Sequence, residues 1–114
     1  MGHQKFQQCI QECLACAVAC SQCAIECLKE ANVKELVNCI QLDLECAAIC
    51  RSAAELMSLG SEYSYYHCSS CVEVCNACAE ECEKHAAMGM EHCRVCAEAC
   101  RKCATACEEM IAVV

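Results

Sequence analysis

The sequence has no proline and no tryptophan, and its 114 residues include only three glycines, one phenylalanine and three tyrosines. The absence of proline removes the strongest helix breaker, so long uninterrupted helices are possible. So few aromatic side chains cannot fill an interior of ordinary composition. Alanine and cysteine must take their place, since a protonated cysteine behaves as a small hydrophobe. The length suits a single domain, which we expect to span residues 1–114.

Basic residues are scarce: eight Lys and Arg stand against sixteen Asp and Glu, and the formal net charge is −8 at pH 7. Because no cluster of basic residues could neutralise phosphates, we expect no nucleic-acid partner. The longest run without a charged residue, Cys13 to Ile25, is shorter than the roughly 18 apolar residues of a membrane span, so we expect no membrane partner. Met1 is not followed by the basic and apolar regions of an export signal. We therefore expect a cytoplasmic location, where thiols stay reduced.

Cysteine dominates the composition, with 19 residues. A short chain with more than about 8–10% cysteine is usually either a disulfide scaffold or a metal-binding protein. The odd number, the expected reducing compartment and the helical spacing all argue against disulfides. A metal site is therefore the better interpretation.

The cysteines form four rows in which consecutive members are 3, 4 or 7 residues apart, the spacing of one helix face. The rows are Cys9, Cys13, Cys16, Cys20, Cys23 and Cys27; Cys39, Cys46 and Cys50; Cys68, Cys71, Cys75, Cys78 and Cys82; and Cys93, Cys96, Cys100, Cys103 and Cys107. The pattern predicts an all-α fold, an antiparallel up-down-up-down four-helix bundle with a Cys-lined core. The predicted helices span about 3–30, 33–58, 62–86 and 90–112.

Helix breakers lie between the rows. Asn32 and Glu35 have the spacing of a capping box at the start of the second helix. Gly60 followed by Ser61 predicts a helix end and the N-cap of the third helix, and Gly89 separates the last two helices.

The antiparallel topology predicts two different ends for the bundle. At one end, which we call the plugged end, the rows continue into apolar residues: Phe6, Met57, Tyr65 and Met110. The other, which we call the open end, collects one terminal cysteine of each row and four further candidate metal ligands: Cys27, Cys39, Cys82 and Cys93 with His85, Met88, Met90 and His92.

Asp43 continues the cysteine spacing of the second helix, where a buried carboxylate is costly unless it is paired. Two interpretations are open. A slight rotation of the helix could turn Leu42 inward and leave Asp43 at the edge of the core. Alternatively, Asp43 accepts hydrogen bonds from a thiol or a histidine near the open end.

The cysteine spacing favours Cu(I) as the bound metal. Side chains three or four residues apart on a helix have Cβ atoms about 5–6 Å apart, so two thiolates can hold one soft ion, with a third sulfur from a neighbouring helix. Zn²⁺ requires four ligands in a tetrahedron, and four thiolates would leave a buried net charge. A Cu⁺ ion that replaces a thiol proton keeps the core neutral. At about one Cu(I) per thiolate, the 19 cysteines predict more than ten ions per chain.

Three other functions compete with this prediction. A zinc or cadmium buffer of metallothionein type would use the same thiolates for divalent ions. An iron–sulfur electron carrier would place its cysteines in loops that wrap the cluster, and these cysteines have helical spacing. A thiol redox enzyme would need one activated cysteine beside a base, and no cysteine stands apart from the rows. We therefore expect no enzymatic activity.

The first predicted helix carries a second apolar stripe, nearly opposite its cysteines: Leu14, Val18, Ile25 and Leu28. An isolated bundle would expose this stripe to water, so we expect a homo-oligomer interface there.

The four cysteine-rich segments, CIQECLACAVACSQCAIEC, CIQLDLECAAIC, CSSCVEVCNACAEEC and CRVCAEACRKCATAC, resemble those of the bacterial copper storage proteins, cytosolic branch. The resemblance covers essentially the whole chain. It implies storage of many Cu(I) ions, copper uptake and release at one end of the bundle, and a homotetramer. It also implies a Cu(I)-ligand role for the nineteen cysteines and an entrance role for His85, Met88, Met90 and His92.

Overall fold

The computed structural model describes residues 2–113, and their side chains from residue 6 to residue 112. Four long helices account for most of these residues: α1 (Gly2–Leu28), α2 (Val37–Ser58), α3 (Ser64–Ala86) and α4 (Glu91–Val113). A short 3-10 helix, η1 (Val33–Leu36), precedes α2. Residues 2–113 contain no strand.

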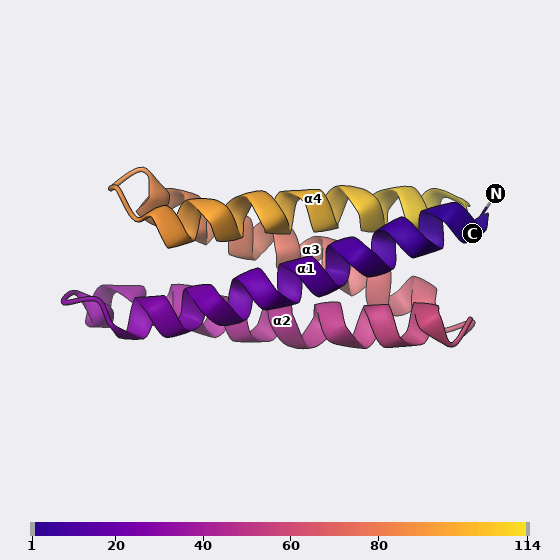
Figure 1. Cartoon of the computed structure of the whole chain (residues 1–114), viewed down its shortest axis with the longest axis horizontal. Helices are drawn as coiled ribbons and strands as arrows, with labels where there is room; N and C mark the ends of the chain where they lie inside the picture. Colours follow the sequence, from indigo (N-terminus) through magenta and orange to yellow (C-terminus); the bar gives the residue numbers. More distant parts are fainter. Residues whose placement is uncertain (1, 114) are drawn as a thin grey trace.

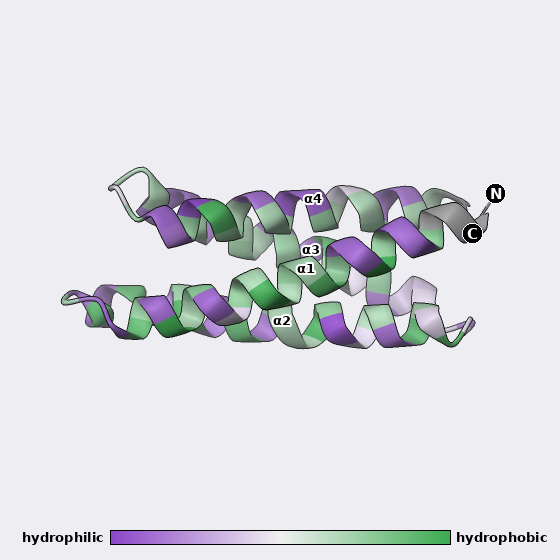
Figure 2. Ribbon diagram, in the orientation of Figure 1, coloured by the Kyte–Doolittle hydropathy of each residue, from purple (hydrophilic) through white to green (hydrophobic). Residues whose placement is uncertain are grey.

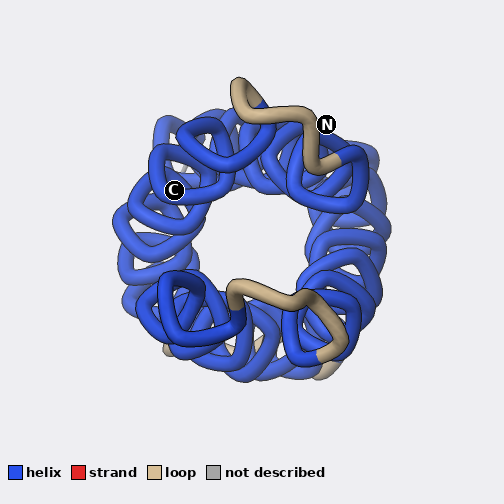
Figure 3. Tube along the Cα trace, turned by 90° about the vertical axis from the view of Figure 1, so that its left-hand side faces the viewer, coloured by secondary structure: helices blue, strands red, loops and turns tan. Residues whose placement is uncertain are grey.

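The four helices form an antiparallel bundle of about 46 × 19 × 17 Å, in which α1 packs against α2 and α4 while α3 closes the ring (Figures 1 and 3). Both termini lie at the same end as the α2–α3 turn, and the α1–α2 and α3–α4 connections lie at the opposite end (Figure 1). The up-down-up-down bundle predicted from the cysteine spacing is confirmed.

Glycine ends two of the helices, as the sequence predicts. Gly60 has a φ of +67° and Gly89 a φ of +99°, a left-handed conformation that side chains with a Cβ rarely adopt. At the end of α2 the amide of Ser61 donates to the carbonyl of Leu56 at 3.0 Å. At the end of α3 the amide of Met90 donates to the carbonyl of His85 in the same arrangement. Both are Schellman motifs, which satisfy backbone carbonyls that a helix end leaves without partners.

The predicted capping box does not form. The Nδ2 of Asn32 contacts the Oε1 of Glu35 at 3.4 Å, but neither side chain bonds a backbone amide at the start of η1. The segment from residue 33 forms one turn of 3-10 helix, and the α-helix begins at Val37. The capping box does not form because its residues lie at the start of a 3-10 turn and not at the start of an α-helix.

Two other helix ends also differ from prediction. The third helix begins at Ser64, not at residue 62. The hydroxyl of Ser61 accepts a hydrogen bond from the amide of Tyr63 at 3.0 Å, so Ser61 stabilises the preceding turn and does not cap the helix. The first helix ends at Leu28, two residues earlier than predicted.

Thiols and alanine methyl groups make up the core, as the shortage of aromatic residues required. All nineteen cysteines are buried, together with alanines that flank them on the same helix faces, such as Ala17, Ala53 and Ala79. Hydrophilic and hydrophobic residues alternate in short stretches along the helices (Figure 2).

The plugged end is built differently from the prediction. Met57 and Met110 are buried and Phe6 is half-buried, but Tyr65 is 45% exposed. Ser64 takes the inner position because it lies four residues before Cys68, which keeps the spacing of the row. The prediction that Tyr65 belongs to the plug is therefore wrong.

By length and composition the segment Phe6–Leu28 could cross a membrane, with a mean hydropathy of 1.2. The uncharged run from Cys13 to Ile25 is by itself too short for such a span. In the structure its apolar character comes from two faces, the buried cysteines and the exposed stripe that begins at Leu14. A core helix of a bundle passes the same test.

Candidate metal centre

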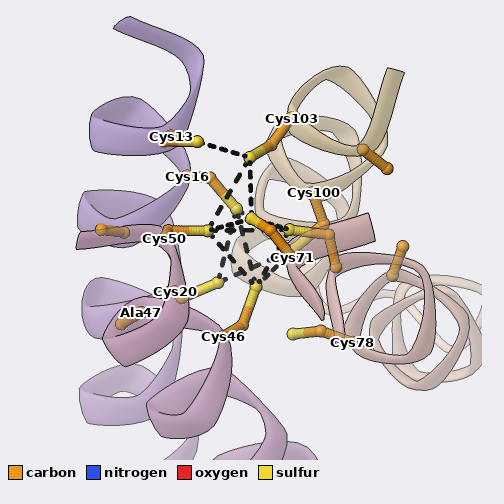
Figure 4. Packing of buried hydrophobic residues seen from close by; sticks show 14 of the residues in the cluster. Cys13, Cys16, Cys20, Cys46, Ala47, Cys50, Cys71, Cys78, Cys100 and Cys103 are labelled. Atoms are coloured by element: carbon orange, nitrogen blue, oxygen red, sulfur yellow. Dashed lines mark hydrogen bonds between the residues drawn. The ribbon is translucent and has the colours of Figure 1, made fainter. Parts of the chain in front are cut away.

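The cysteine sulfurs of all four helices converge on the axis of the bundle (Figure 4). At its middle, Cys46 of α2 lies 3.5 Å from Cys75 of α3 and 3.8 Å from Cys16 of α1, sulfur to sulfur. Cys100 of α4 lies 3.7 Å from Cys16. One sulfur from each helix thus meets its neighbours at nearly the same height, and the rows read from the sequence become a continuous column of thiols.

The cysteines are all free thiols, and they are arranged in groups of four whose sulfurs lie within 4.8 Å of one another. Five such groups are Cys13, Cys71, Cys103 and Cys107; Cys16, Cys46, Cys50 and Cys75; Cys16, Cys20, Cys46 and Cys100; Cys20, Cys78, Cys96 and Cys100; and Cys23, Cys27, Cys39 and Cys93. Cys16, Cys20, Cys46 and Cys100 each belong to two of these groups. The third group therefore cannot act as a four-ligand site independent of the second and the fourth, and the sulfurs that it shares with them can bridge several small ions.

The contacts within a row and the contacts between rows are of similar length. Cys71 and Cys75, four residues apart on α3, have their sulfurs 3.6 Å apart, and Cys13 and Cys103, on α1 and α4, have the same separation. A metal ion can thus bind two sulfurs of one helix and a third from the next, which is the coordination that Cu(I) accepts.

Burial disfavours the thiolate form of these cysteines while no metal is bound. It raises the pKa of the Cys27 thiol, because a thiolate loses its hydration in the core. A metal-free core of protonated thiols is neutral. Each monovalent ion that replaces a proton preserves that neutrality, whereas a divalent ion on four thiolates does not.

Asp43 lies inside the column of thiols, with 0% of its surface exposed. Its Oδ1 accepts hydrogen bonds from Cys78 at 3.2 Å, Cys96 at 3.3 Å and Cys82 at 3.7 Å, while its Oδ2 has no partner among the described residues. Burial, together with the charges of Cys96 and Cys78 when ionised, raises the pKa of Asp43 to about 11. The interpretation that places Asp43 at the edge of the core is wrong, and the interpretation as an acceptor for thiols is confirmed.

At the open end, His92 lies between the sulfurs and the surface. Its Nδ1 is 3.6 Å from the sulfur of Cys23 and 3.6 Å from that of Cys93, and its Nε2 is 2.9 Å from a carboxylate oxygen of Glu30. A carboxylate that holds one ring nitrogen of a histidine fixes the direction of the other. The imidazole is therefore held with a nitrogen against two thiols.

The other three open-end candidates lie differently. His85 pairs through its Nε2 with Glu81 at 3.1 Å, Met90 is half-buried against the core, and Met88 is 76% exposed. The structure brings only His92 of the four into hydrogen-bonding range of cysteine sulfurs. The i,i+4 spacing of Glu81 and His85 could have predicted their pairing.

No comparable sequence signal connects Glu30 with His92. The two residues are 62 positions apart in the chain, so only the folded arrangement of α1 and α4 brings them together. No pattern in the sequence therefore predicts a role for Glu30.

The sequence model of the copper storage protein family matches residues 2–112 of this chain. Among solved structures, a cytosolic copper storage protein from Streptomyces lividans, with five coppers, is similar with a TM-score of 0.93 and 44% identity, over 97% of this chain and 95% of that one. The copper-free copper storage protein 3 of Bacillus subtilis is similar with a TM-score of 0.85 and 40% identity, over 92% and 97% of the two chains.

One curated sequence is also similar. The uncharacterized cysteine-rich protein YhjQ of Bacillus subtilis is 40% identical over 71 residues, which covers 62% of this chain and 66% of the relative.

Proposed function

The chain belongs to the copper storage protein family, and we propose that it stores Cu(I) on the thiolates of its nineteen cysteines. The observation that carries this proposal is the overlap of the four-sulfur groups, in which four cysteines each belong to two groups. Shared sulfurs suit a soft monovalent ion that needs two or three ligands. The Streptomyces lividans protein has been obtained with five coppers and with ten copper equivalents, and the structure of copper storage protein 3 includes a Cu(I)-bound form.

The charge of the core favours a capacity of more than ten ions. With about one Cu⁺ per thiolate, the core stays neutral at every stage of filling. A zinc or cadmium buffer would instead need separate tetrahedral sites. Four of the five groups share no cysteine and could supply them, but each divalent ion on four thiolates would leave a net negative charge in the buried core. The role is one of binding, and we propose no catalytic step.

We propose that copper enters and leaves at the open end. His92 is then the first ligand that lies beside the thiols. Its imidazole links the surface carboxylate of Glu30 with the sulfurs of Cys23 and Cys93. His85, Met88 and Met90 surround the same end. Of these, Met88 is exposed enough to meet an incoming ion or its donor.

We also propose that the protein is a cytoplasmic homo-oligomer, and a tetramer by its family. The stripe on α1 is exposed to solvent in the single chain: Leu14, Val18, Ile25 and Leu28 are 47–55% exposed. A contiguous apolar stripe of this kind is expected to be covered by a partner copy. The cytosolic location stated for the Streptomyces lividans protein supports the cytoplasmic assignment.

The decisive experiment is an anaerobic titration of the fully reduced protein with Cu(I), against a chromophoric Cu(I) chelator. Retention of more than about ten equivalents per chain supports storage, since one ion per thiolate keeps the core neutral. Retention of one or two would contradict it and indicate a carrier. Metal analysis of protein isolated from cells tests the alternative, because a zinc or cadmium buffer would hold about five divalent ions on four thiolates each.

A further inference from the structure

A thioether lies against the thiols at the plugged end of the bundle. The Sδ of Met57 is 3.7 Å from the Sγ of Cys68, a separation within the range of the thiol–thiol contacts along the axis. Both side chains are buried, with 3% and 1% of their surface exposed. The column of sulfurs therefore does not stop at Cys68, the first cysteine of α3, but continues to a methionine of α2.

Two further sulfurs adjoin this pair. Cys107 of α4 and Cys9 of α1 are near enough to Cys68 to raise the pKa of its thiol, and their own sulfurs lie 3.6 Å from each other. One sulfur from each of the four helices is thus available here, as it is at the middle of the bundle. The difference is that α2 supplies a thioether in place of a thiol.

Cavities reach this group of sulfurs from outside. A cavity of about 210 Å³ is lined by Cys68 together with Phe6, Tyr65 and Met110. A second cavity of about 410 Å³ is lined by Met57, and Phe6 lines both. Both residues of the pair therefore line cavities at the plugged end, at the opposite end of the bundle from His92.

The chemistry of the pair suits a soft monovalent ion. Thiolate and thioether sulfurs both select Cu(I), and the thioether adds a ligand without adding charge. A sulfur binds a d10 metal ion at about 2.3 Å, so two sulfurs on one ion lie no more than about 4.6 Å apart. The separation of Met57 and Cys68 satisfies this limit without movement of either helix. Packing alone would be served equally well by leucine.

We propose that Met57 and Cys68 form a mixed thioether–thiolate Cu(I) site at the plugged end, with Cys9 or Cys107 as a third sulfur. On binding, Cu⁺ replaces the thiol proton of Cys68, which leaves to the buffer, and the Met57 sulfur donates a lone pair without losing a proton. No electron is transferred. This inference rests on the proposed storage function and adds a ligand that is not a cysteine to the stored pool.

The test uses the full chain labelled with [¹³C-methyl]methionine and titrated anaerobically with Cu(I), with a chromophoric chelator in the same series to count the bound ions. The methyl resonance of Met57 is identified by its absence from a Met57→Leu variant, which keeps a side chain of similar volume. We expect this resonance to move to a new position as the protein fills. Met110, buried at the same end, reports any general repacking.

A second measurement separates bonding from repacking. In selenomethionine-labelled, copper-loaded protein, selenium X-ray absorption should show a copper neighbour at bonding distance that is lost in Met57→Leu. The site is overturned if the copper neighbour of selenium persists unchanged in the variant, or if the Met57 resonance of the parent protein stays fixed while the chain fills with copper. The chelator series judges storage separately. If the chain retains only one or two ions, storage fails, and the selenium spectrum still decides whether one of them binds Met57.

Discussion

Asp43 Oδ1 lies 3.2 Å from the sulfur of Cys78 in the middle of a core that is otherwise built from thiols and methyl groups. A carboxyl group in such surroundings is stable only in its neutral form, and its pKa is raised to about 11. The metal-free protein therefore holds one carboxyl proton that the unfolded chain would release. The free energy of unfolding must depend on pH for this reason.

We expect the metal-free protein to become less stable as the pH rises from 5 to 7, by as much as about 1.4 kcal/mol per pH unit from this group. The unfolded chain loses the Asp43 proton above its ordinary pKa of 3.8, whereas the folded chain keeps it up to about 11. The folded state therefore binds more protons throughout this window, and stability falls with pH. Urea unfolding at several pH values, under reducing conditions and with chelator present, measures the slope.

The variant Asp43→Asn supplies the control, because an amide of the same shape does not titrate. The slope of its unfolding free energy with pH should be flatter than that of the parent protein by the contribution of this one group. Parallel slopes for the two proteins would show that Asp43 is ionised in the folded core, contrary to its burial.

The fold could be predicted from the sequence because every cysteine of a row lies three, four or seven residues from the next. That periodicity fixes one face of each helix and, with short connections, the antiparallel order. The helix starts were predicted less well. Asn32 with Glu35, and Ser61, have the residue types of caps, but in each case the chain first makes a turn, and the helix begins at Val37 or Ser64. The residue types therefore indicate that a turn is near, and the packing at the ends of the bundle determines the residue at which the helix begins.

The candidate site could be predicted only as rows of possible ligands. Which sulfur of one row meets which sulfur of the next, such as Cys16 with Cys46, depends on the relative heights of the helices, and no local pattern encodes these. The same limit explains the uncertainty over Asp43. A rotation of α2 by a fraction of a turn exchanges it with Leu42, and only contacts with α3 and α4 select the observed orientation.

The central cysteines should matter more to copper capacity than those at the ends. Cys100 lies within 3.6–4.0 Å of Cys16, Cys20 and Cys46, whereas Cys27 contacts only Cys23 at this range among the described residues. We expect Cys100→Ala to lower the capacity by at least about two ions and Cys27→Ala by about one, because a bridging sulfur serves several ions. Chelator titrations of the two variants make the comparison. Equal losses would indicate that the ions do not share sulfurs.

The open-end histidines should differ in their effect on uptake. His92→Ala removes an imidazole held against two sulfurs, so we expect uptake from a chelated Cu(I) donor to slow on the order of tenfold. His85→Ala is the matched control, since His85 pairs with Glu81 in the structure, and its effect should be smaller. Stopped-flow traces give the rates, and the final capacity of both variants should match that of the parent. A larger effect of His85→Ala would move the uptake point to α3.

The exposed stripe of α1 should control assembly. Val18 and Ile25 lie seven residues apart on this stripe and are both about half-exposed in the single chain, at 54% and 53%. If a partner copy covers them, Val18→Glu with Ile25→Glu places two carboxylates in an apolar interface, which is costly unless they are paired. Sizing chromatography with light scattering should then detect smaller species than the parent forms. The double variant Ser70→Glu with Ala77→Glu adds the same charge at two exposed positions of α3, also seven residues apart. Because α3 does not pack against α1 among the described residues, this control should keep the parental size. Because the stripe faces away from the thiols, both double variants should retain their copper capacity. A parental size for the Val18 and Ile25 variant would place the interface on another face of the bundle.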